Sequence, residues 1–301
     1  MIRYNIDGVS FDMKSQHDFS FLRSCGRVFR SFDQSDSGNI SFGLDDGNEK
    51  YFVKVAGGMT VNSCTSPQRA IEALKSAMPI YCELAHPHLV QLVDHFPANG
   101  LYAAVFKWAE GDCLFDYWNF QKYESNCQMP PRERFKKLPM DEKIAAFDTI
   151  FDFLMHTESK GFVAVDFYDG SIMYDFRRAR VTICDIDFFR KGPSVNDMGE
   201  NFWGTRRLKA PEEYVLGAEI DSATNVFALG ALLMHFFGEY TSDEVQKMYA
   251  KKTFFPCRYE NWQLGGGLYQ VTLKAVSHDR AGRHGTLADF YEEWNAGVSA
   301  L

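Results

Sequence analysis

Residues 225–237 are apolar around nearly the whole circumference of the helix that they would form. Such a helix is stable only when other elements surround it on all sides. The segment therefore predicts a buried central helix, and the chain must supply further elements to enclose it. With 301 residues and a hydrophobic fraction of 46%, the chain is long enough for one large core or for two domains.

Helical spacing of apolar residues recurs elsewhere in the second part of the chain. The clearest case is 141–159, and 268–277 and 287–296 show the same period. Residues 125–139 contain Pro130, Pro131 and Pro139 and are expected to form a loop. From residue 109 to residue 301 the sequence thus predicts a mainly helical domain.

Residues 1–108 have a different pattern. Apolar and polar residues alternate, or apolar residues run together, in five short segments separated by turn residues, which predicts strands at 26–32, 39–43, 50–55, 89–96 and 101–108. Between the third and fourth strands, 67–84 predicts a helix that Pro79 should kink or interrupt. The expected fold class is α+β, with an antiparallel sheet and one helix before residue 109.

Charge and cysteine content exclude several classes of protein. The net charge is −8, the pI is about 5.5, and no block of Lys and Arg stands out, so neither nucleic acid nor a membrane is the expected partner. The seven cysteines form no C-x-x-C pair, which favours free, buried thiols in a reducing cytoplasm. The N-terminus lacks the apolar core of a signal peptide. The oligomeric state stays open.

Two acidic residues follow short apolar runs, Asp166 after 161–165 and Asp185 after 181–184. Each alone is typical of a turn or a helix cap. However, Lys54 lies upstream within the strand expected at 50–55, and Ala210-Pro211-Glu212 lies downstream. Phosphoryl transfer needs a cation on the phosphates, an acid that holds Mg²⁺ and an acid beside the incoming hydroxyl. In this order the residues resemble the signature of the protein-kinase superfamily.

The most specific match is the stretch 203–212, which resembles G-T-x-x-Y-x-A-P-E. Residues 225–230 then resemble D-x-W-S-L-G, and Arg283 matches the arginine that pairs with the A-P-E glutamate, here Glu212. The chain specifically resembles divergent bacterial relatives of eukaryotic-type serine/threonine kinases, over about residues 26–295. The resemblance implies a bilobal fold, with an N-lobe at 1–108 and a C-lobe at 109–301.

The resemblance also implies a role for individual residues. Asp166 would be the catalytic acid–base residue together with Lys54, and Asp185 and Ser171 would hold Mg²⁺. The residues that would bind ATP are Gly38, Ser37, Ile40, Lys54, Phe106, Trp108 and Asp112. The implied function is ATP-dependent, Mg²⁺-assisted phosphorylation of Ser or Thr hydroxyls in a protein or peptide.

Several positions depart from the family pattern. Two of the three loop glycines are Asp33 and Ser35, and the position of the helical glutamate that pairs with the nucleotide lysine is Ala77, with Glu72 as the better substitute. In the catalytic loop, Val165 replaces the arginine that reads a phosphate on the activation loop, and Tyr168 replaces a lysine. These departures leave two alternatives open: a pseudokinase that acts as a nucleotide-binding or scaffold module, and a small-molecule kinase.

Overall fold

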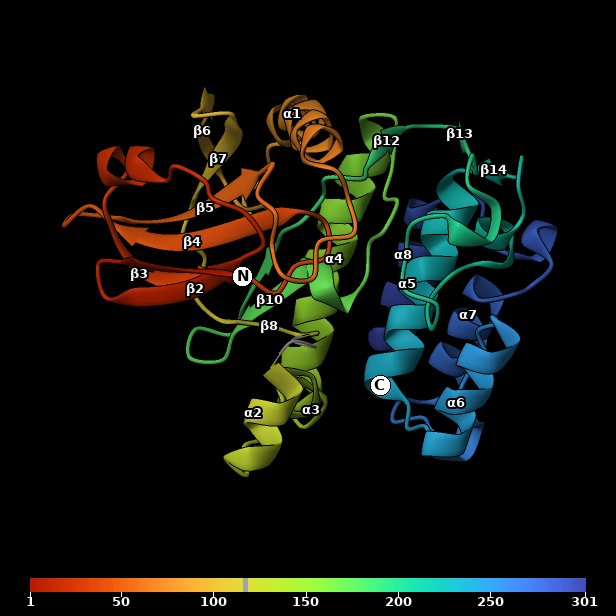
Figure 1. Cartoon of the computed structure of the whole chain (residues 1–301). Helices are drawn as coiled ribbons and strands as arrows, with labels where there is room; N and C mark the ends of the chain where they lie inside the picture. Colours follow the sequence, from red (N-terminus) through yellow and green to blue (C-terminus); the bar gives the residue numbers. More distant parts are fainter. Residues whose placement is uncertain (116–118) are drawn as a thin grey trace. The chain divides into compact units, whose positions relative to one another are not determined.

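The computed structural model describes residues 1–115 and 119–301, without the side chains of 120–122 (Figure 1). The chain has mixed α and β structure and divides into two compact units, Met1–Glu110 and Gly111–Leu301. The sequence placed this division after residue 108.

The first unit is built on a five-stranded antiparallel sheet. Its strands are β3 (Arg27–Phe32), β4 (Asn39–Asp45), β5 (Lys50–Ala56), β6 (Leu92–Ala98) and β7 (Leu101–Lys107). Their order in the sheet is β3-β4-β5-β7-β6, and all neighbours are antiparallel. The five strands expected from the sequence are therefore present, with ends that differ by a few residues.

One face of this sheet is covered by the N-terminal segment, which the sequence analysis did not assign. A hairpin of β1 (Ile2–Ile6) and β2 (Val9–Met13) precedes a short 3₁₀ helix, η1 (Ser20–Ser24). Phe11 and Phe19 from this segment pack on Phe42 of β4 with ring centroids 5.2 and 5.6 Å away. The signal for the hairpin was Asp7-Gly8, since both residues have positive φ and this dipeptide favours a two-residue turn.

The other face of the sheet carries α1 (Pro67–Glu83), which begins at the N-cap Ser66. The buried side of α1 consists of Ala70, Leu74, Ala77, Met78 and Tyr81. Of the two effects expected of Pro79, a kink or an interruption, the interruption is wrong, because α1 continues to Glu83. A proline removes one hydrogen bond and crowds the carbonyl four residues earlier, but the packing of the buried side on both sides of Pro79 keeps the helix continuous.

The second unit is organised around α5 (Ser222–Phe237), the buried central helix predicted from its sequence. Most of its residues are buried, and Asp221 caps its N-terminus by accepting a hydrogen bond from Ala223 N at 2.8 Å. It packs against α3 (Pro131–Lys136), α4 (Met140–Ser159), α7 (Gly266–Ala275) and α8 (Leu287–Val298). The two remaining α-helices that the structure describes here are α2 (Phe120–Ser125) and α6 (Ser242–Lys251).

Two expectations need correction in this part of the chain. Residues 125–139 are not one loop, because Pro130 and Pro131 start α3, and proline is well tolerated in the first turn of a helix. None of the cysteines forms a disulfide, as expected, but only Cys257 is buried, and Cys64, Cys82 and Cys127 are exposed. Apolar neighbours in the sequence do not show whether the thiol of a cysteine faces the core or the solvent.

Small antiparallel sheets hold the loops of the second unit. The largest contains β11 (Arg180–Ile183), β10 (Ile172–Asp175) and β8 (Asp112–Cys113), in that order. In addition, β9 (Phe162–Val163) pairs with β12 (Arg190–Lys191), and β13 (Ser194–Val195) pairs with β14 (Glu219–Ile220). These pairings fix the ends of 164–171 and 184–187, the two segments that carry the acids singled out by the sequence.

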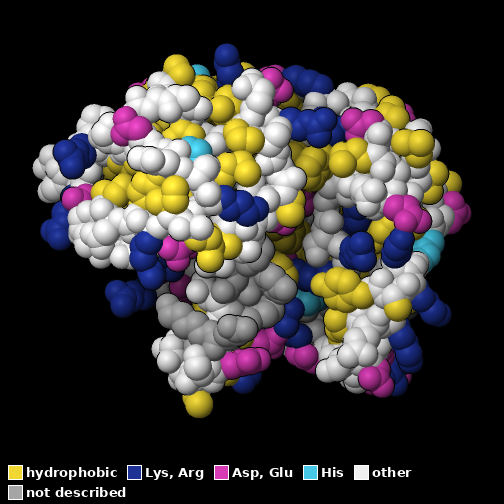
Figure 2. Space-filling view, in the orientation of Figure 1, with side chains coloured by type: hydrophobic (Ala, Val, Ile, Leu, Met, Phe, Trp, Pro, Cys, Tyr) yellow, Lys and Arg dark blue, Asp and Glu magenta, His cyan; other side chains and the backbone are white. Residues whose placement is uncertain are grey.

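On the face drawn in Figure 2, Lys and Arg side chains are scattered among acidic and apolar ones and form no single basic patch. Among the helices of the described residues, none has the length and apolar character needed to cross a membrane.

Candidate functional site

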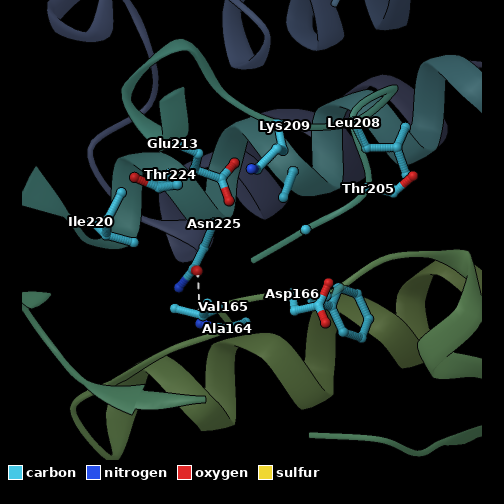
Figure 3. A pocket seen from close by; sticks show the side chains of 13 residues that line it. Ala164, Val165, Asp166, Thr205, Leu208, Lys209, Glu213, Ile220, Thr224 and Asn225 are labelled. Carbon is cyan, nitrogen blue, oxygen red and sulfur yellow. Dashed lines mark hydrogen bonds between the residues drawn. The ribbon is translucent and has the colours of Figure 1, made fainter. Parts of the chain in front are cut away.

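The loop 164–171 connects β9 to β10 and carries Asp166. Its start is fixed to the central helix, because Ala164 N donates a hydrogen bond of 2.9 Å to Asn225 Oδ1 (Figure 3). Asp166 has a φ of +64°, in the left-handed region that non-glycine residues seldom adopt. Such backbone conformations cost on the order of 1–3 kcal/mol and are concentrated at functional sites, where the surrounding structure maintains them.

Asp185 lies at the end of β11, beside the end of the same loop. Ser171 precedes β10, and Cys184 N donates a hydrogen bond of 2.9 Å to Ser171 O. Asp185 follows Cys184 directly and also has a left-handed φ, +54°. The β10–β11 pairing therefore brings Ser171 and Asp185 close together, as the sequence interpretation of a shared metal site requires.

The donors at this position fit Mg²⁺ in chemical type, since a carboxylate and a hydroxyl are both oxygen ligands. Ser171 is fully buried, and its Oγ has no hydrogen-bond partner among the described residues, so this oxygen has capacity for a ligand. The described residues contain no group of three or more His, Cys, Asp or Glu side chains that could hold a metal ion. A metal ion here would rely on Asp185 and Ser171 together with oxygens of a bound phosphate.

A buried ion pair, which the spacing of residues in the sequence did not reveal, includes an acid that lies between Asp166 and Asp185 in the sequence. Asp169, in the 3₁₀ helix η3 (Asp169–Ser171), accepts a hydrogen bond from Arg207 Nη2, and both residues are buried. The Arg207 guanidinium lies 4.7 Å from the centroid of the Phe115 ring. This pair ties η3 to the segment that precedes Ala210.

His235 of α5 lies 3.9 Å from Asp169 but does not add a second positive charge. Burial, and then the positive charges of Arg207, Arg132 and Lys136, hold the pKa of His235 well below its ordinary value. The imidazole is therefore neutral at pH 7, and Arg207 is the cation that compensates Asp169.

Tyr168 fills the space where the kinase resemblance expects a lysine. Its ring folds over Gly170, where a Cβ atom would lie only 2.4 Å from Tyr168 Cε2. Burial is the main reason that the pKa of Tyr168 lies well above its ordinary value, and the negative charges of Asp166 and Asp185 add to this shift. The phenol thus stays protonated and lies near both acids.

A small cavity of about 20 Å³ lies behind Asp166 (Figure 3). Its walls include Thr205, Lys209, Glu213 and Asn225, and in Figure 3 the head groups of Lys209 and Glu213 point toward one another. Lys209 Nζ donates a hydrogen bond to Phe202 O, and Glu213 Oε2 accepts one of 2.7 Å from Ala210 N. Both side chains are almost fully buried.

Burial affects both of these ionisable groups. It raises the pKa of Glu213 to about 8, with Glu212 and Asp166 acting in the same direction and the Ala210 amide and Lys209 acting against it. It lowers the pKa of Lys209, which the negative charges of Glu213 and Asp166 oppose.

Glu212 and Arg283 form the bidentate ion pair that the sequence predicts. Arg283 Nη1 lies 2.7 Å from Glu212 Oε1, and Arg283 Nη2 lies 3.0 Å from Glu212 Oε2. The side chains are 9% exposed for Glu212 and 0% for Arg283. Thr224 Oγ1 also donates to Glu212 Oε1 at 2.8 Å, which joins this pair to α5.

In the first unit, Lys54 lies on β5 between Ser41 of β4 and Ala104 of β7. Its sequence neighbours Val53 and Val55 belong to the core under the N-terminal hairpin, so alternation places Lys54 on the face that carries α1. The buried side of α1 has no acidic residue, and Glu72 is exposed, where it accepts a hydrogen bond of 2.9 Å from Gln68 Nε2. The structure thus gives Glu72 no position as a partner of Lys54.

The turn around Gly38 is tied to its surroundings. Cys64 N donates to Asp36 O at 2.9 Å, and Asp33 Oδ2 accepts a hydrogen bond of 3.1 Å from Asp12 N of the hairpin. Gly38 has a φ of +80°, and a Cβ there would lie 3.2 Å from the Cβ of Ala70, so this residue faces the start of α1. Ser37 is held within the turn, because its N and Oγ lie 3.3 and 2.7 Å from Ser35 Oγ.

Ile40, a residue that the sequence assigned to the nucleotide, lies on the opposite face of the sheet from Lys54. It is fully buried in the core under the hairpin and pairs with Val55. The β4 residues on the Lys54 face are Asn39, Ser41 and Gly43, by alternation along the strand.

The three remaining nucleotide candidates already have contacts. Phe106 is buried, with its ring centroid 4.8 Å from that of Tyr81. Trp108 N donates to Lys50 O at 3.0 Å, and its ring lies 5.0 Å from Phe29. In the second unit, Asp112 Oδ2 accepts a hydrogen bond of 3.0 Å from Arg134 Nη1.

Searches of the sequence against protein-family models and against curated proteins found no match. The functional interpretation therefore rests on the residues and the geometry described above.

Proposed function

We propose that the protein is an ATP-dependent phosphotransferase that phosphorylates Ser or Thr hydroxyls of a protein or peptide with the help of Mg²⁺. The observation that carries the proposal is the arrangement of Asp166, Ser171 and Asp185. Two acids with left-handed backbones, φ +64° and +54°, follow the short strands β9 and β11, and a backbone hydrogen bond joins Ser171 to the residue before Asp185. Phosphoryl transfer needs two acids with separate tasks.

In this proposal, Asp166 binds the incoming hydroxyl and accepts its proton as the hydroxyl oxygen bonds to the γ-phosphorus and the bond to the ADP oxygen breaks. Asp185 and Ser171 hold Mg²⁺, which neutralises the charge that develops on the phosphate oxygens. Lys54 places an ammonium group on the phosphates.

A protein substrate is favoured over a small molecule by the contacts of Glu212. Its bidentate pair with Arg283 agrees with the A-P-E interpretation of residues 210–212, a feature that the resemblance to protein kinases implies.

A second candidate is a nucleotide-binding or scaffold module that does not transfer phosphate. This candidate is favoured by the loop before β4, where Asp33 and Ser35 stand at two of the three glycine positions, and by Gly38, which faces Ala70. Both features reduce the organisation expected around a triphosphate.

Turnover of γ-labelled ATP separates the two candidates. The wild-type protein with Mg²⁺ should transfer label to itself or to an added protein acceptor, and Asp166→Asn should lower the rate by about 100-fold or more, the range expected for a general base. Asp243→Asn, an exposed acid in the first turn of α6, is the control and should keep the wild-type rate. Equal rates for Asp166→Asn and wild type would exclude the catalytic role of Asp166, and no turnover by wild type would favour the binding module.

A further inference from the structure

The catalytic loop has no positive charge of its own. Residues 164–171 include two acids, Asp166 and Asp169, and no Lys or Arg. The charge of Arg207 is already paired with that of Asp169. Stabilisation of charge in a transferring phosphoryl group normally uses positive side chains close to the reacting atoms.

A different cation, Lys209, lines the cavity behind Asp166. Lys209 is only 4% exposed. Its side chain and that of Glu213 both pack against Gly204: a Cβ atom at Gly204 would lie 3.3 Å from Lys209 Cε and 3.5 Å from Glu213 Oε1. Asp166 and Lys209 line the same cavity, which has about the volume that one ordered water molecule needs.

The cavity also contains an unused polar group. Asn225 is 4% exposed, its Oδ1 accepts the hydrogen bond from Ala164 N, and its Nδ2 has no hydrogen-bond partner among the described residues. A water molecule in the cavity can accept from Asn225 Nδ2 and donate to a carboxylate, and buried waters typically have such partners.

We propose that Lys209 is a positioning residue of the phosphotransfer reaction, which orients Asp166 from behind through one ordered water molecule in the cavity that both residues line. The inference rests on the proposed role of Asp166. Lys209 is held by its hydrogen bond to Phe202 O, and the head group of Glu213, which accepts from Ala210 N, points toward that of Lys209 (Figure 3).

The charges that act on Lys209 agree with this geometry. The negative charges of Glu213 and Asp166 favour its protonated form, whereas burial and Arg206 oppose it. By reciprocity, a protonated Lys209 favours the ionised form of Asp166, which is the form that accepts a proton from the substrate hydroxyl.

The first test compares steady-state ATP turnover of four full-length proteins across pH. Lys209→Met should lower kcat by about tenfold or more, keep KM for ATP, and move the acid limb of the rate profile to higher pH. Lys209→Met/Glu213→Gln removes both ionisable groups that line the cavity, so neither is left buried without the other, and this variant should fold and still show the same loss. The control is Lys143→Met, because Lys143 is equally buried but is held by Lys136 O and Gln263, outside the cavity.

A second test does not depend on activity. The ¹³Cε signal of Lys209, assigned by its loss in Lys209→Met, should titrate at lower pH in Asp166→Asn than in wild type, while the Lys143 signal should not move. An unchanged Lys209 titration, or a Lys209→Met rate equal to that of Lys143→Met, would overturn the inference while the proposed function stands. If wild type shows no turnover, the proposed function fails, and the role of Lys209 in a reaction fails with it.

Discussion

Replacing Glu212 with Gln should destabilise the second unit strongly without any direct effect on the acids of the candidate site. The substitution keeps the size of the side chain and removes its charge. Arg283 then remains as a buried cation, since its side chain is fully buried and cannot turn to solvent. Removing one partner of a buried pair costs about 3–5 kcal/mol. The hydrogen bonds from Arg283 to Ser277 O and Ala223 O persist, so we expect about 3 kcal/mol.

The assay is thermal and urea unfolding of the full chain. At about 2–4 °C per kcal/mol for a unit of this size, the melting temperature should fall by roughly 6–12 °C. The matched control is Asp197→Asn, because Asp197 pairs with Arg190 at 3.3 Å but is 62% exposed. A pair of this kind contributes about 0–1 kcal/mol.

The pH dependence of unfolding provides an independent check on the same pair. Burial alone would raise the pKa of Glu212, but the hydrogen bonds and charge of Arg283 outweigh it, and the pKa lies below its ordinary value. The stability from this carboxylate is therefore complete above the ordinary pKa and is lost as pH falls through the lower, folded-state pKa. Glu212→Gln should flatten this acid limb. If Glu212→Gln melts like wild type, the buried ion pair does not exist, and the A-P-E interpretation loses its main structural support.

Three further predictions concern the ligand, regulation and pH. ATP with Mg²⁺ should raise the melting temperature only at high nucleotide concentration, because Asp33 and Asp36 place negative charge in the turn before Gly38, and a shift at micromolar ATP would contradict this. Phosphatase treatment should leave turnover unchanged, because Val165 carries no charge and Arg207 is bound to Asp169, and a large loss would mean that the exposed Arg206 reads a phosphate. Since the pKa of Glu213 is raised to about 8, wild type should lose stability as pH rises from about 5 to 8, and Glu213→Gln should lose less in urea unfolding.

The periodic elements of the fold could be predicted from the sequence. The central helix α5 and the amphipathic α4 have patterns that only helices satisfy, and the strands β3 and β5 have clear turn residues at their ends. The N-terminal hairpin carried an equally good signal in Asp7-Gly8. It was missed because the expected fold left no place for strands before residue 26.

The faces of the elements were harder to predict. Nearly every residue of β4 is buried, since the hairpin covers one side of the sheet and α1 the other. The alternation along β4 shows that Ile40 and Ser41 face opposite sides, but the sequence does not give the strand register that places Ser41, and not Ile40, beside Lys54. The spacing of Glu72 and Ala77 shows that they lie on different sides of α1 but not which side meets the sheet. That choice depends on packing between elements.

The pair Asp169–Arg207 could not be found from sequence because its members lie 38 residues apart and neither belongs to a matched motif position. The same holds for Lys209, which is near Asp166 only through the cavity. Long-range pairs of this kind are fixed by the tertiary structure, whereas Glu212 and Arg283 could be paired because both occupy motif positions.

These pairs together constrain one short segment. Within residues 207–213, Arg207 pairs with Asp169 of the loop 164–171, Glu212 pairs with Arg283 and accepts a hydrogen bond from Thr224 of α5, and Glu213 accepts one from Ala210 N. Separating either ion pair would leave a desolvated ion at a cost of several kcal/mol. A segment that switches between ordered and disordered states needs alternatives within a few kcal/mol of each other. We infer that residues 207–213 are set in one arrangement by internal charges, so regulation, if the protein is a phosphotransferase, acts elsewhere than on this segment.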